Sequence, residues 1–87
     1  MSEQNKIIPI LYESQSPAGG FNVRLPNEQI KRFPTSTIVQ ERLDESIDIL
    51  FDHIHLAHYA KGEFLSFFPT IAANCRRTKI RWHGDRD

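Results

Sequence analysis

The stretch from Thr35 to Gly62, TSTIVQERLDESIDILFDHIHLAHYAKG, decides the fold that this sequence predicts. Its start carries a capping-box pattern, in which the Thr37 side chain accepts from the backbone N–H of Gln40 and the Gln40 side chain reaches back to Thr37. No proline interrupts the stretch, and Lys61 followed by Gly62 suits the C-terminal end of a helix. We therefore predict one long central α-helix from Thr37 to Lys61.

The predicted helix is amphipathic. Apolar residues recur at alternating steps of four and three, which keeps them on one helix face. These residues are Leu43, Ile47, Leu50, Ile54 and Ala57. At about 1.5 Å per residue the helix spans roughly 35 Å, more than the diameter expected for so small a domain. Its apolar second half must then be covered, either by a second copy of the chain or by the chain's own C-terminal segment.

The predicted protein-binding surface lies on this helix and combines its apolar second half with its acidic side chains. It comprises Asp44, Ile47, Asp48, Leu50, Phe51, Ile54 and Leu56.

The segments before the helix favour strands. Lys6 to Tyr12 is rich in branched and aromatic residues, although Pro9 confines such a strand to an edge or a bulge. Phe21 to Leu25 alternates apolar and polar residues. We predict that these two strands form an antiparallel hairpin with a long loop over residues 13–20. Asn27 to Phe33 is expected to form a short helix or turn.

The segments after the helix complete an α+β domain. Residues 63–68, EFLSFF, are expected to fold back onto the long helix as core, and Pro69 to start a short second helix, PTIAANC. Cys75 to Trp82 is expected to form a half-buried basic strand. The predicted fold is thus an N-terminal β-hairpin, one long central α-helix, a short second helix and a C-terminal basic strand, in one domain of 87 residues with frayed ends at 1–5 and 84–87.

Composition indicates a globular chain without a global electrostatic field. Apolar residues make up 39% and charged residues 25%, and eleven basic residues balance eleven acidic ones. Locally, residues 41–52 are acidic and residues 76–81 are basic. The single cysteine, Cys75, excludes an internal disulfide and favours a reducing compartment. Without an apolar run of about 20 residues or a signal-peptide pattern, we expect a cytoplasmic protein that does not bind membranes.

Three histidines near the end of the predicted helix are the main candidates for metal binding. His55 and His58 have the spacing that two ligands on one helix need, and His53 lies beside them. Further ligands would have to come from Asp52, Cys75 or His83, and no motif selects among these. Cys75 likewise has no flanking pattern of a nucleophile. We therefore predict no metal site, no cofactor and no enzymatic activity.

The basic segment, with Arg76, Arg77, Lys79 and Arg81, is suited either to bind phosphates or to pair with the acidic half of the helix. Residues 21–28, FNVRLPNE, resemble the start of a ribbon-helix-helix DNA-binding protein of the phage-repressor type. That resemblance implies a strand paired across a dimer, with Asn22 and Arg24 reading bases and TSTIVQERLDESI as the second helix.

These observations lead to two functional hypotheses. The first is a small non-enzymatic regulatory protein, an adaptor or inhibitor of the kind found in mobile elements and phages, that binds another protein and forms a homodimer. The alternative is a homodimeric DNA-binding transcriptional regulator that uses Asn22, Arg24 and the basic segment.

Overall fold

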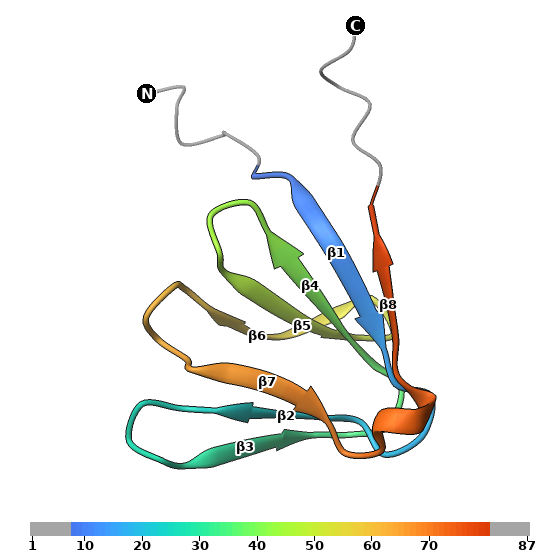
Figure 1. Cartoon of the computed structure of the whole chain (residues 1–87). Helices are drawn as coiled ribbons and strands as arrows, with labels where there is room; N and C mark the ends of the chain where they lie inside the picture. Colours follow the sequence, from blue (N-terminus) through green and yellow to red (C-terminus); the bar gives the residue numbers. More distant parts are fainter. Residues whose placement is uncertain (1–7, 81–87) are drawn as a thin grey trace, which may run out of the picture.

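A computed structural model describes residues 8–80, and these residues form an almost entirely β structure (Figure 1). It has eight strands and one short 3-10 helix. In chain order they are β1 (Ile10–Gln15), β2 (Phe21–Arg24), β3 (Ile30–Phe33), β4 (Thr37–Arg42), β5 (Ile47–Phe51), β6 (Ile54–Tyr59), β7 (Ser66–Pro69), the 3-10 helix η2 (Ala72–Asn74) and β8 (Arg76–Lys79).

The strands form two antiparallel sheets. One has five strands in the order β6-β5-β4-β1-β8, and the other has three in the order β3-β2-β7. Figure 1 shows that the sheets approach each other beside η2 and diverge toward the opposite side of the molecule. The strands β4, β5 and β6 follow one another as a meander, so the β5–β6 hairpin forms one edge of the larger sheet.

The predicted central helix is wrong, because its residues form the meander β4-β5-β6. The side chains of β5 alternate between the two faces of the sheet: Ile47 and Ile49 are buried in the core, and Asp48 between them is buried on the outer face. Leu43, which belongs to the predicted helical stripe, lies exposed in a turn. The predicted capping box is also absent. The Thr37 hydroxyl donates to the Pro34 carbonyl oxygen at 2.8 Å, inside β4 rather than at a helix start.

The hairpin turns explain the wrong helix prediction. In the β5–β6 turn both central residues, Asp52 and His53, have positive φ angles of 51° and 67°, as a two-residue type I′ turn requires. The β2–β3 and β4–β5 hairpins have three-residue loops that end in Glu28 and Glu45, each at a φ of 71°. Glycine or asparagine usually occupies such positions. None of these four turn residues is glycine or asparagine, so the sequence lacks the usual hairpin signal.

The two sheets share one hydrophobic core. Three of its buried side chains come from each sheet, and together they are Phe21, Val23, Phe33, Val39, Ile47 and Ile49. The ring of Phe67 on β7 packs edge-on against Phe21, with ring centroids 6.1 Å apart. Alternate residues of β5 point to the opposite face of the five-stranded sheet, away from this core.

Other parts of the predicted α+β fold need correction. The predicted N-terminal hairpin is wrong, since β1 pairs with β4 and β8 while β2 pairs with β3 and β7. Asn27 to Phe33 contains a turn and β3 instead of a short helix. The predicted PTIAANC helix is reduced to the three residues of η2. In the Asn27 to Phe33 segment, backbone pairing of β3 with β2 replaces the local helical bonds that the sequence favoured.

The C-terminal basic strand is confirmed as β8, although all four of its residues are exposed and it is not half-buried. Four predictions concern residues outside the described range: the frayed ends, the start of the first strand at Lys6, and the roles of Arg81 and His83. Within residues 8–80, no helix is long and apolar enough to cross a membrane.

Candidate metal centre

Two histidines and one aspartate converge on the β5–β6 hairpin. Oδ1 of Asp48 lies 2.7 Å from Nε2 of His55 and 2.7 Å from Nδ1 of His58. The three atoms all lie within 4.8 Å of one another. A carboxylate oxygen and two imidazole nitrogens are common ligands of divalent transition metals. Among the described residues, this is the group of side chains with the clearest capacity to bind an ion.

Strand register and a β-bulge bring these side chains together. Asp48 pairs directly with His58 across the hairpin, and Leu50 pairs with His55, while the register shifts in between. The shift makes Leu56 an extra residue on β6. In a regular strand, residues three apart point to opposite faces. The bulge instead turns His55 to the same outer face as His58 and Asp48.

Arg42 fixes the other side of the carboxylate. Its Nε donates to Oδ2 of Asp48, and its Nη1 donates to the backbone carbonyl oxygen of Ile8 at 2.6 Å. The Asp48 side chain is only 7% exposed, although it points away from the core. It is buried because Arg42 and the two histidines surround it. The carboxylate is therefore held in one orientation with Oδ1 directed toward the imidazoles.

Opposing effects set the protonation of Asp48. Burial raises the pKa of its carboxyl, but hydrogen bonds from Arg42, His55 and His58 outweigh burial and lower the pKa to about 2. Asp48 is thus ionised at neutral pH. An ionised carboxylate can bind a metal ion directly. The two imidazole nitrogens that face it share protons with it, and these protons must leave before the nitrogens can bind the ion.

Sequence reasoning selected the two histidines but not their partner. Of the three candidate third ligands, Asp52 lies in the turn, Cys75 follows η2 and is not part of the cluster, and His83 is outside the described residues. Asp48 was instead assigned to a protein-binding helix face. The missing signal was the hairpin itself: regular pairing about a two-residue turn at Asp52 and His53 would place residue 48 opposite residue 57, and the bulge at Leu56 moves this pairing to residue 58.

The residues predicted to form a protein interface are distributed over both faces of the hairpin. Ile47 belongs to the core and Asp48 to the histidine cluster, while Asp44 lies in the β4–β5 turn. Leu50 is half-buried on the outer face. The other three are exposed: Phe51 (39% exposed) and Ile54 (60%) beside the hairpin turn, and Leu56 (42%) at the bulge of β6.

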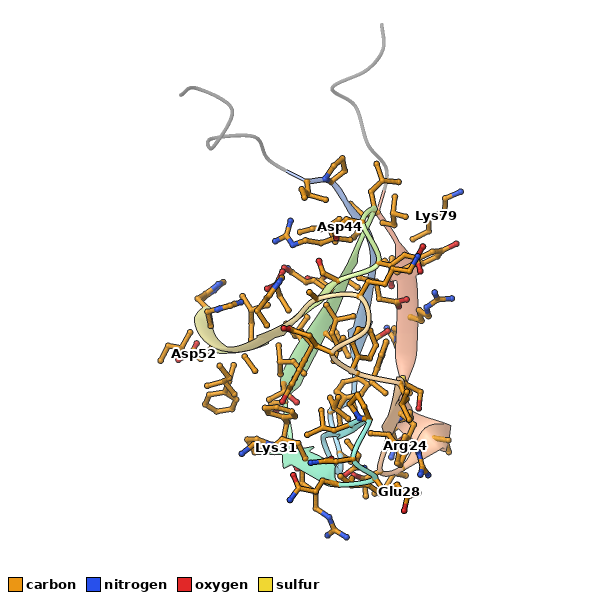
Figure 2. The ribbon with its side chains drawn as sticks, turned by 90° about the vertical axis from the view of Figure 1, so that its left-hand side faces the viewer. Arg24, Glu28, Lys31, Asp44, Asp52 and Lys79 are labelled. Carbon is orange, nitrogen blue, oxygen red and sulfur yellow. The ribbon has the colours of Figure 1, made fainter. Side chains whose placement is uncertain are left out.

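The residues predicted to bind DNA do not form one surface. Figure 2 shows Arg24 and Lys79 at opposite ends of the molecule. Asn22 is only 7% exposed, and its side-chain amide donates to the Thr70 hydroxyl at 2.8 Å. The ribbon-helix-helix architecture is wrong for this chain, because β2 lies between β3 and β7 within one sheet and TSTIVQERLDESI forms β4, a turn and the start of β5.

The basic strand β8 is partly neutralised within the chain. Nε of Arg77 lies 2.8 Å from Oε2 of Glu41, and its Nη2 lies 3.0 Å from Oε1. The guanidinium also stacks over the Tyr12 ring at 3.8 Å from the centroid. This ion pair raises the pKa of Arg77. The predicted pairing between the basic segment and the acidic stretch is thus present at Arg77.

An open cleft of about 420 Å³ lies beside this ion pair, where the two sheets diverge. Its lining includes the apolar side chains of Ile47, Phe64 and Phe67. Polar side chains also line it, among them Tyr12, Ser46 and Ser66. The charged side chains of the lining are paired within the chain: Glu41 with Arg77, Arg42 with Asp48 and Glu45 with Lys61.

Comparisons with protein-family models, curated proteins and solved structures gave no match to this chain.

Proposed function

We propose that this chain is a small non-enzymatic regulatory protein that acts by protein–protein binding and forms a homodimer through the free edge of its β5–β6 hairpin. The observation that carries the proposal is the group of exposed apolar side chains on this hairpin, Phe51, Ile54 and Leu56. Figure 2 shows the hairpin turn, marked by Asp52, standing out at one side of the molecule. Such a projecting apolar edge is accessible to a partner.

The backbone of β6 supports the same role. Among residues 8–80, β6 has β5 as its only hydrogen-bonded neighbour, which leaves backbone donors and acceptors on its other side. Natural edge strands are commonly protected by lysine, proline or inward-pointing charges. The sequence of β6, IHLAHY, has no proline, lysine, arginine or acidic residue. β6 does contain the bulge at Leu56, which is another feature that protects edge strands, but its side chains are suited to pairing with another strand.

A second copy of the chain is the partner that we propose for this edge. Antiparallel pairing of two identical strands is self-complementary about a two-fold axis. The formal net charge of the chain is zero, so no long-range repulsion opposes association of two copies. A chain of 87 residues also gains from extra buried surface, because a small domain buries a modest fraction of its own.

Sedimentation and light scattering over a range of concentrations test this proposal. We expect the wild type to dimerise, and Ile54→Lys to raise the dimer dissociation constant at least about tenfold, since it would place a lysine charge in the apolar edge of each copy. Leu65→Lys is the matched control, because Leu65 and Ile54 are both 60% exposed. A monomeric wild type at high micromolar concentration, or equal effects of the two lysines, would rule out this interface.

DNA binding has less support as the function. The residues that it requires lie at opposite ends of the molecule, and the Arg77 charge is paired with Glu41. If duplex DNA binding were observed at low salt and weakened as salt rose, it would revive the alternative.

A further inference from the structure

We propose that the β5–β6 hairpin binds a divalent transition-metal ion of the Zn²⁺ type through Oδ1 of Asp48, Nε2 of His55 and Nδ1 of His58. The starting observation is that both imidazoles share a single carboxylate oxygen, at 2.7 Å each. In the metal-free protein a proton occupies each of these two contacts. One cation can replace both protons and bind all three atoms at once.

The spacing of the three atoms fits such an ion after small side-chain movements. With bonds of about 2.0–2.1 Å, ligand atoms around a tetrahedral zinc ion lie roughly 3.3 Å apart. The two oxygen–nitrogen distances, 2.7 Å each, are shorter than this, and the three atoms already lie within 4.8 Å of one another. Both imidazoles can turn outward to admit an ion, because the His55 and His58 side chains are 53% and 47% exposed.

The carboxylate is the fixed part of the site. Asp48 is the second residue of β5 and is nearly buried, and Arg42 binds its other oxygen while also contacting the carbonyl oxygen of Ile8. Contacts of this kind orient the ligands of known metal sites and support their affinity. Arg42 leaves Oδ1 available on the side where the imidazoles lie. Binding therefore requires movement of two exposed side chains and none of the backbone.

The ligand types select the class of metal. Imidazole nitrogen suits Zn²⁺ and its neighbours in the first transition row, whereas Mg²⁺ and Ca²⁺ prefer sites made of oxygen atoms. The positive charge of Arg42 beside the carboxylate repels a cation, which further disfavours ions such as Mg²⁺ and Ca²⁺ that bind mainly by electrostatic attraction. Three protein ligands leave a fourth position of a tetrahedral ion facing solvent, between the half-exposed imidazoles.

This proposal does not depend on dimerisation. All three ligands and Arg42 come from one chain, so a monomeric protein should bind the ion equally well. The binding measurement and the sedimentation experiment can therefore fail separately.

The first test is titration of the full chain, after treatment with a chelator, by calorimetry and thermal unfolding. We expect one Zn²⁺ ion per chain, and a rise in Tm of at least about 5 °C when free Zn²⁺ reaches roughly 100 times the dissociation constant. Mg²⁺ and Ca²⁺ should leave Tm unchanged. Absence of a zinc-dependent rise in Tm, or an equal rise with Mg²⁺, would overturn the proposal.

Histidine variants locate the ion. His55→Gln and His58→Gln keep an amide donor for Asp48 but remove the ligating nitrogen, and each should weaken zinc binding at least about tenfold. His53→Gln is the matched control, since His53 lies in the same hairpin outside the cluster and should leave affinity unchanged. Circular dichroism of each variant without metal checks folding. Equal affinities for all three variants would contradict the assignment.

Spectroscopy then identifies the ligating atoms. In ¹⁵N-labelled protein, zinc should shift the Nε2 resonance of His55 and the Nδ1 resonance of His58. A different ring nitrogen should therefore respond in each of the two side chains. Co²⁺ in place of zinc should show ligand-field bands without a thiolate charge-transfer band. Such a thiolate band, lost in Cys75→Ser, would place the ion at Cys75 and overturn the site proposed here.

Discussion

Two glycines with positive φ angles differ in how closely other atoms approach them. Gly20 and Gly62 both have positive φ, at 68° and 92°. A Cβ atom added at Gly20 would lie 2.1 Å from the carbonyl oxygen of Phe33, whereas at Gly62 it would meet nothing within 4 Å. Gly20 therefore permits close approach of two backbone segments where the chain enters β2, and Gly62 serves backbone conformation alone.

Alanine substitutions separate these two effects. Gly62→Ala should cost about 1 kcal/mol of unfolding free energy, through its positive φ only. Gly20→Ala carries the same conformational cost together with a backbone clash, and should cost at least about 3 kcal/mol. Denaturant unfolding of both variants measures the difference. Similar midpoints for the two would mean that Gly20 is not as closely packed as described.

Asp48 also has a structural role that does not require a metal. Removing its carboxylate in Asp48→Ala leaves the partly buried Arg42 guanidinium without this partner, and should cost about 2–3 kcal/mol in the presence of chelator. Asp48→Asn retains the shape and one acceptor oxygen, so it should cost less. Chemical unfolding of the two variants gives the comparison. An alanine variant as stable as the wild type would show that the contact with Arg42 has no net effect.

At the level of elements, the sequence predicts individual strands better than their connections. The alternation in Phe21 to Leu25 correctly indicates β2, and the basic strand β8 is correctly placed. The meander is missed because IDILF satisfies the helical spacing as well as a period of two, and no glycine marks its turns. The bulge at Leu56, which brings His55 to Asp48, depends on tertiary pairing and leaves no pattern in the sequence.

The unusual turn residues predict a stabilising substitution. Glu28 is exposed at a φ of 71°, a region that costs about 1 kcal/mol or more for residues other than glycine. Glu28→Gly should therefore stabilise the protein by about 0.5–1 kcal/mol, once the greater freedom of glycine in the unfolded chain is included. Glu28→Ala is the control, because alanine removes the same carboxylate but gains no access to positive φ. Equal effects of the two would argue against the assigned turn.

Neighbouring residues of β5 distinguish a strand from the helix that the sequence predicts. The helical pattern puts Leu50 on the buried stripe and Ile49 off it, whereas in the sheet Ile49 is fully buried and Leu50 lies on the outer face. Ile49→Ala should cost about 2–5 kcal/mol and Leu50→Ala less than about 1.5 kcal/mol. Thermal or denaturant unfolding ranks the pair. The reverse order would restore the helical interpretation of this segment.

At the scale of the whole molecule, neither sheet has a hydrophobic core of its own. The buried side chains of β2 and β3 pack against those of β4 and β5, so the outward face of each sheet contributes little to burial. Without this contact the apolar face of the three-stranded sheet would be exposed to water, at a cost in hydrophobic free energy. We infer that the two sheets unfold as one cooperative unit, despite their divergence beyond the core in Figure 1.

Hydrogen exchange tests this cooperativity. Val23→Ala removes buried volume from the three-stranded sheet, and should cost about 2 kcal/mol. Because the core is shared, the slowest amides of β4 and β5 in the other sheet should lose protection by the same free energy as those of β2. Thr78→Ala on the exposed strand β8 is the control and should leave both sets unchanged. If β4 and β5 kept their protection while β2 lost it, the five-stranded sheet would be a separate folding unit, and the shared core would not govern stability.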